Sequence, residues 1–104
     1  MQTGYQKMAS IVDLGVGEIK RVDINGRGYL LANVEGEFFV ADDLCTHEDV
    51  SLALGCLKGE WIKCSLHGSQ FNLRTGEVME EPADEPLRVY PVKIEDGDVF
   101  AKLD

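Results

Sequence analysis

Hydrophobic residues in this chain fall into short runs, each followed by residues that favour turns. Asn25-Gly26 lies between the apolar positions of segments 22–24 and 28–31. This dipeptide between two such runs is a strong signal for a two-residue β-hairpin. Glu-Gly and Asp-Gly dipeptides divide further runs, with Glu35-Gly36 between 31–34 and 38–40, and Asp96-Gly97 between 89–94 and 99–103. The pattern predicts short strands separated by tight turns.

The last two runs have a period of two residues. Val92 and Ile94 alternate with Lys93, and the segment 99–103 has apolar residues at its odd positions. An apolar residue at every second position is typical of a strand with one buried face. Helical periodicity can be argued only for segment 10–19, and Gly15 and Gly17 weaken that interpretation. We expect a loop with one turn there.

Regularly spaced short strands predict an all-β chain, folded as an antiparallel sandwich or small barrel. At 104 residues the chain has the size of one domain. The middle segment, roughly 43–85, differs in being rich in Gly, Cys, His and Pro, with very short strand candidates at 61–63 and 70–73. It is interpreted as a group of loops on a β scaffold, which is where functional sites are usually placed.

Charge and cysteine content narrow the possible functions. Lys plus Arg number 10 and Asp plus Glu 19, so the net charge is −9. Nucleic acid and anionic lipid are therefore excluded as expected partners, since binding phosphate needs basic residues. A basic protein surface fits the charge better, although acidity also simply keeps a protein soluble. No apolar run near the N-terminus is long enough for a signal peptide or a spanning helix, which predicts a cytoplasmic protein without a membrane segment.

Four metal-competent side chains form two close pairs. One residue separates Cys45 from His47, two residues separate Cys64 from His67, and sixteen residues lie between the pairs. Each pair can reach one inorganic centre from a single loop. In a cytoplasmic protein with three cysteines, metal binding is expected rather than a disulfide framework. The residue types alone leave a tetrahedral zinc site as a competing interpretation.

The string C-T-H, followed after sixteen residues by C-x-x-H-G, resembles the Rieske motif. The resemblance covers essentially the whole chain, including a proline-containing segment at 82–87 similar to the family's third cluster loop. It implies the Rieske fold, with a β-sandwich or barrel base and a cluster-binding subdomain at roughly 43–85 of one domain, 1–104. It also implies a [2Fe–2S] cluster with Cys45 and Cys64 on one iron and His47 and His67 on the other.

Within this family the chain is similar to the ferredoxins of bacterial aromatic-ring hydroxylating dioxygenases, such as those acting on biphenyl, naphthalene or carbazole. Respiratory Rieske proteins carry two extra cysteines at the positions of Val50 and Leu66, so their disulfide cannot form here. Cys56 matches no ligand position and is expected to be a structural thiol. The resemblance implies a monomeric one-electron carrier, itself not an enzyme, between a nicotinamide-dependent flavin reductase and a terminal Rieske oxygenase. Two alternatives are the small Rieske subunit of a nitrite reductase and a zinc-stabilised interaction module.

Two further expectations concern the surroundings of the cluster. Ser69 occupies a position where high-potential relatives donate a hydroxyl hydrogen bond to a cluster sulfide, while Phe71 replaces their second donor, a tyrosine. This predicts a reduction potential at the low end of the Rieske range. The other interpretation is that Ser69 is a turn residue whose side chain forms a hydrogen bond within its own loop. Glu48 and Asp49 are expected to face a basic patch of a redox partner.

Overall fold

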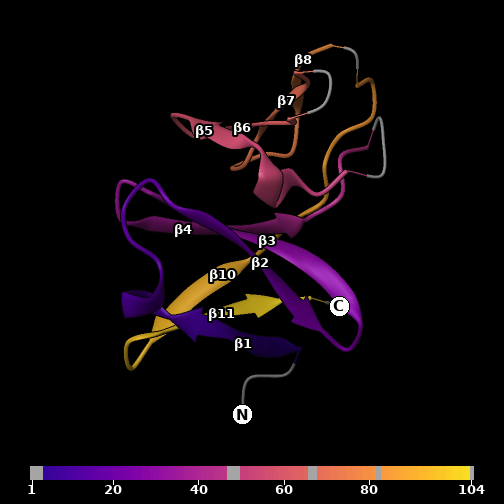
Figure 1. Ribbon diagram of the computed structural model, residues 1–104. Helices are drawn as coiled ribbons and strands as arrows, with labels where there is room; N and C mark the ends of the chain where they lie inside the picture. The colour runs from indigo at the N-terminus through magenta and orange to yellow at the C-terminus, as the bar shows by residue number, and fades with distance from the viewer. Residues whose placement is uncertain (1–3, 47–49, 66–67, 82, 104) are drawn as a thin grey trace.

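The computed structural model describes residues 4–46, 50–65, 68–81 and 83–103, and these form strands and two short 3₁₀ turns (Figure 1). The strands of the described part are β1 Tyr5–Ser10, β2 Ile19–Ile24, β3 Arg27–Val34, β4 Glu37–Asp42, β5 Cys56–Lys58, β6 Trp61–Lys63, β7 Gln70–Asn72, β8 Val78–Glu80, β9 Val89–Tyr90, β10 Val92–Glu95 and β11 Asp98–Lys102. The turns are η1 Ile11–Asp13 and η2 Leu52–Leu54. Every strand pair within the three sheets is antiparallel.

The lower part of the molecule in Figure 1 is a base of two sheets. Their strand orders are β1-β11-β10 and β2-β3-β4-β9. Met8 and Val99 from the first sheet pack with Leu31, Val40 and Tyr90 from the second in one buried core. The two sheets thus bury a shared apolar face, as the period of two in the sequence predicts.

A third sheet, of order β5-β6-β7-β8, lies above the base. Its side chains join a second core that reaches down to the base through β3 and β4. This second core contains Leu30 and Ala41 from the base together with Ile62 and Phe71 from the third sheet. The two central base strands are therefore buried on both faces, which fixes the position of the third sheet on the base.

The turn dipeptides act as the sequence predicts. Asn25-Gly26, Glu35-Gly36 and Asp96-Gly97 each form a two-residue connection, and both residues of every pair have positive φ, from 52° to 93°. Two successive positive φ values are the requirement of the type I′ hairpin turn, whose twist matches the flanking strands. The turn expected in segment 10–19 is η1.

Segment 89–94 is not one continuous strand, which corrects the sequence interpretation. Pro91 divides this segment into β9, which pairs with β4, and β10, which pairs with β11. Proline cannot donate a ladder hydrogen bond, so the chain leaves one sheet there and enters the other. Strand β1, which has no clear alternation in sequence, forms through its pairing with β11 at the opposite end of the chain.

Candidate metal centre

Cys45, the first predicted ligand, follows β4. Cys45 is buried, with 3% of its surface exposed, and its amide donates to the carbonyl of Val50 at 2.9 Å. Leu44 and Ser51 form an antiparallel bridge beside it. The two arms of the loop are therefore paired, and Cys45 lies inside that pairing. His47 is among residues 47–49, outside the described part of the chain.

Cys64, the second predicted cysteine ligand, follows β6 directly. Cys64 is 2% exposed, its amide donates to the carbonyl of Ser69 at 2.8 Å, and its carbonyl accepts from the amide of Gly68 at 3.2 Å. Gly68 has φ of +80°, a conformation that favours glycine. The backbone therefore closes on itself directly behind Cys64. His67 lies outside the described residues.

A third segment connects both loops through side-chain hydrogen bonds. The hydroxyl of Ser69, fully buried, accepts from the amide of Ala83 at 3.0 Å. The hydroxyl of Thr46 donates to the carbonyl of Glu85 at 2.8 Å. The segment expected to be the third cluster loop thus holds the two cysteine loops together. Thr46 was not singled out in the sequence, and its position between Cys45 and His47 was the available signal.

The donor set of the described residues fits an iron–sulfur cluster. Cys45 and Cys64 belong to the same core as Leu52, Ile62 and Phe71. Two sulfur donors in apolar surroundings suit a soft, thiolate-bound centre, and water is excluded from this side of it. Cys56, by contrast, is exposed at the start of β5. The fold therefore buries the two predicted cysteine ligands in one core, whereas Cys56, which lines a surface hollow together with Cys64, is exposed.

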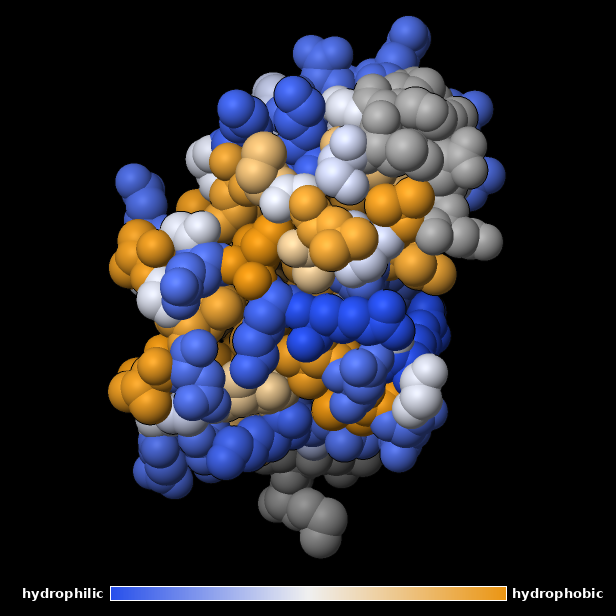
Figure 2. Space-filling view, viewed as in Figure 1, coloured by the Kyte–Doolittle hydropathy of each residue, from blue (hydrophilic) through white to orange (hydrophobic). Residues whose placement is uncertain are grey.

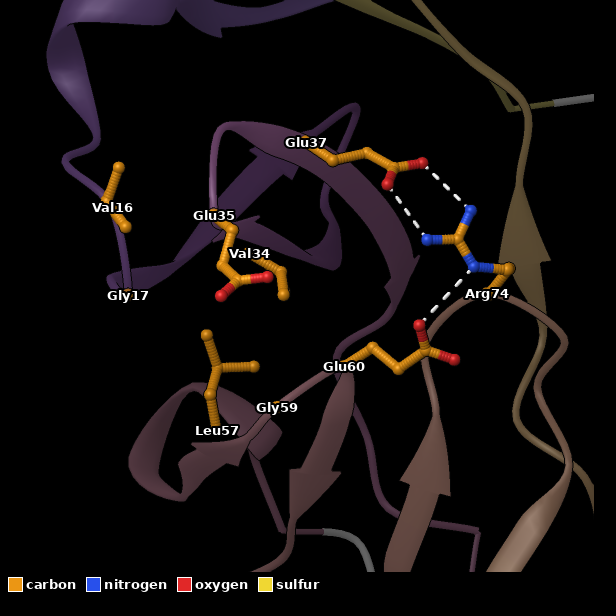
Figure 3. A pocket seen from close by; sticks show the side chains of 9 residues that line it. All are labelled: Val16, Gly17, Val34, Glu35, Glu37, Leu57, Gly59, Glu60 and Arg74. Atoms are coloured by element: carbon orange, nitrogen blue, oxygen red, sulfur yellow. Dashed lines mark hydrogen bonds and ion pairs between the residues drawn. The ribbon is translucent and has the colours of Figure 1, made fainter.

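A hollow of about 500 Å³ lies elsewhere, between the base and the third sheet, and neither Cys45 nor Cys64 lines it (Figure 3). Val16, Val34 and Leu57 line one part of it. At its rim Arg74 donates to both carboxylate oxygens of Glu37, at 2.8 and 2.9 Å, and to Glu60 at 3.4 Å. These hydrogen bonds raise the pKa of Arg74 and lower that of Glu37. The hollow marks an ionic contact between the third sheet and the base.

Apolar side chains reach the surface near the cysteine loops. Leu44, beside Cys45, is 47% exposed, and Leu54, at the end of η2, is 72% exposed. Figure 2 shows hydrophobic residues on the lower part of the half that carries the third sheet and on parts of the base, and hydrophilic residues at the top. Exposed apolar groups of this kind are suited to protein contacts. None of the described helical segments is long and apolar enough to cross a membrane.

Comparison with known proteins shows the family to which this combination of fold and site belongs. The model of the Rieske [2Fe–2S] domain matches residues 4–91. The chain therefore belongs to the Rieske [2Fe–2S] family, whose cofactor is the predicted [2Fe–2S] cluster, and the expected fold is confirmed.

Its relatives define the kind of Rieske protein more closely. The chain is 42% identical to the biphenyl dioxygenase ferredoxin subunit of Pseudomonas sp. strain KKS102, over 92% of this chain and 89% of that protein. It is 36% identical over the full length of both to the ferredoxin component of the naphthalene 1,2-dioxygenase/salicylate 5-hydroxylase systems of Ralstonia sp.. The Sphingomonas yanoikuyae B1 ferredoxin superposes with a TM-score of 0.90 at 34% identity, over 95% of this chain and 98% of that one. The chain is a ferredoxin of this kind, an electron-transfer component, as the sequence predicted.

Proposed function

We propose that this ferredoxin carries single electrons from a nicotinamide-dependent flavin reductase to the terminal oxygenase of an aromatic-ring hydroxylating system. The full-length similarity to dioxygenase ferredoxins supports this role most directly. A structural neighbour with a TM-score of 0.91 and 32% identity, over 97% of this chain and 94% of that chain, comes from a complex of reduced oxygenase and oxidised ferredoxin in carbazole 1,9a-dioxygenase. These relatives favour the dioxygenase role over that of a nitrite reductase subunit, and a cluster over zinc.

The proposed ligands are Cys45 and Cys64 on one iron and His47 and His67 on the other. When bound, the cluster supplies a one-electron redox centre. Two thiolates cancel the +2 charge of two ferric ions and two sulfides, and this raises the potential above that of a site with four thiolates. The burial of both cysteines keeps water from the thiolate side. With all four protein ligands in place, no open position is left for substrate.

The proposed organisation is one domain, 1–104, with a cluster-binding subdomain at roughly 43–85. The second core, shared between β3, β4 and the third sheet, supports the single-domain arrangement. We place the protein in the cytoplasm as a monomer. Reduced nicotinamide is available in the cytoplasm, and the exposed thiol of Cys56 stays reduced in that compartment.

Ligand replacement with cluster analysis tests the site. Cys45→Ala and Cys64→Ala should each abolish the [2Fe–2S] absorbance, iron, acid-labile sulfide and the EPR signal of the dithionite-reduced protein. Cys56→Ala is the matched control and should keep all four. Loss of the cluster in Cys56→Ala, with the fold retained, would overturn the ligand assignment.

A reconstituted electron-transfer chain tests the role. The holoprotein is mixed with the flavin reductase and terminal oxygenase of a biphenyl dioxygenase system. Product formation should depend on both the ferredoxin and NADH. A loaded cluster that is not reduced by the reductase, or does not reduce the oxygenase, would contradict the proposed role.

A further inference from the structure

Among the described residues, Asp43 is the one acidic or basic residue that is almost completely buried, with 1% of its surface exposed. It follows β4 and lies two residues before Cys45. Burying a carboxylate costs free energy unless donors and cations compensate its charge. The residues that compensate Asp43 therefore indicate what this carboxylate holds in place.

Both carboxylate oxygens bind the far arm of the first cysteine loop. Oδ2 accepts from the hydroxyl of Ser51, and Oδ1 accepts from the amide of Ala53 at 3.1 Å. The carbonyl of Asp43 also accepts from the amide of Leu52 at 2.5 Å. Asp43 thus joins the residue that enters the loop to the residues that leave it, and the segment carrying Cys45 lies between these contacts.

A cation from the base completes the arrangement. Nη1 of Arg21, on β2, lies 3.7 Å from Oδ2 of Asp43. Its guanidinium group lies against Gly28 on the neighbouring strand. A Cβ atom at Gly28 would lie 2.6 Å from Nε and 2.7 Å from Cζ of Arg21. The absence of a side chain at Gly28 therefore allows Arg21 to reach the buried carboxylate.

We propose that Asp43, held by Arg21 across Gly28, is a positioning residue for the cluster. It closes the loop before the cluster is bound, so that the thiol of Cys45 is already placed for its iron. A site organised in advance loses less conformational freedom on binding and retains its cofactor longer. This inference rests on the proposed role of Cys45 as a ligand.

The first test compares Asp43→Asn with Asp42→Asn. Both variants remove one carboxylate charge, but Asp42 binds Arg27 and Tyr90, which belong to the base. Two quantities are measured: the rate at which a chelator bleaches the cluster, and the midpoint of thermal unfolding. Asp43→Asn should bleach about tenfold faster, since hydrogen bonds to charged groups are worth at least that factor. Asp42→Asn should lower the unfolding midpoint and bleach at the wild-type rate.

The second test uses Gly28→Ala, which acts on Arg21 and leaves the carboxylate of Asp43 in place. Gly28 does not have positive φ, so the backbone of β3 accepts alanine, and the unfolding midpoint should fall no further than in Asp42→Asn. Its Cβ displaces Arg21, so cluster bleaching should become severalfold faster. Combining Gly28→Ala with Asp43→Asn should add little, because both act on one contact. Ser51→Ala should accelerate bleaching in the same direction.

The outcomes separate this inference from the ligand assignment. If Asp43→Asn does not fold, the bleaching rates of Gly28→Ala and Ser51→Ala test the positioning role of Asp43. Wild-type bleaching rates in these variants would overturn the positioning role while leaving Cys45 as a ligand. A wild-type protein that binds no [2Fe–2S] cluster would overturn both proposals.

Discussion

Ser69 shows how one hydroxyl connects two loops. It is fully buried and accepts the hydrogen bond of the Ala83 amide. Ser69→Ala leaves that amide without this acceptor, and an unsatisfied buried donor costs about 1–3 kcal/mol. We expect the unfolding free energy to fall by that amount and the Ala83 amide to exchange faster with deuterium. An unchanged exchange rate at Ala83 would contradict this.

The same variant distinguishes the two sequence interpretations of Ser69. The bond to Ala83 uses an oxygen lone pair and leaves the hydroxyl proton free to donate. If that proton binds a cluster sulfide, the reduction potential of Ser69→Ala should fall, because the donor stabilises the reduced state. An unchanged potential would leave Ser69 as a loop-bonding residue only.

Tyr90 makes stability depend on alkaline pH. Burial, together with its hydrogen bond to Asp42, raises the pKa of Tyr90 to about 12, compared with about 10 in the unfolded chain. Since the folded state holds the proton more tightly, its contribution is complete below pH 10 and is lost as pH rises towards 12. We expect the unfolding free energy to fall over this range by up to about 3 kcal/mol. In Tyr90→Phe, measured by urea unfolding, this part of the slope should disappear.

At the scale of elements, Arg74 joins the third sheet to the base. It lies between Glu37 at the start of β4 and Glu60 in the turn between β5 and β6 (Figure 3). All three side chains are substantially exposed, so solvent and salt screen their interaction. Arg74→Gln should lower the thermal midpoint slightly at low salt, and the difference from wild type should vanish near 1 M salt. A difference independent of salt would point to the packing of Arg74 on Phe39 instead.

The elements differ in how far the sequence determined them. The hairpin turns were predictable, because two adjacent residues with positive φ are a local requirement that Asn-Gly, Glu-Gly or Asp-Gly can meet. The short strands β5 and β8 were not predicted, and each forms by pairing with a neighbour in the third sheet. The equally short β6 and β7 contain the aromatic residues Trp61 and Phe71, which favour strands, whereas β5 and β8 contain no aromatic residue and too little alternation to be recognised without their partners.

For the whole molecule, the net charge of −9 predicts electrostatic steering towards a basic partner surface. Glu48 and Asp49 lie outside the described residues, and their proposed role rests on their position beside His47 in the sequence. The reduction rate by the reductase should fall with ionic strength, since salt screens attraction beyond roughly 10 Å at 0.1 M. Glu48→Gln with Asp49→Asn should show a shallower dependence.

A matched control gives this experiment its specificity. Glu35→Gln with Asp96→Asn removes the same charge from exposed positions in the β3–β4 and β10–β11 turns of the base. If this control variant reduces the dependence of the rate on ionic strength by the same amount, the net charge controls the reduction rate, and docking near His47 does not. A rate that rises with salt would contradict steering altogether.

The sequence alone determined the turns and the class of fold, and it predicted the ligand pairs, because spacing within one loop and backbone preference within one turn are local properties. Only the tertiary structure decided which buried groups support the site. In the sequence Asp43 is one of 19 acidic residues, and only the structure shows its contacts with Arg21, Ser51 and Ala53. The bond between Ser69 and Ala83 likewise spans fourteen positions of the chain. Such contacts depend on how sheets and loops pack, and burial then makes each hydrogen bond decisive for stability.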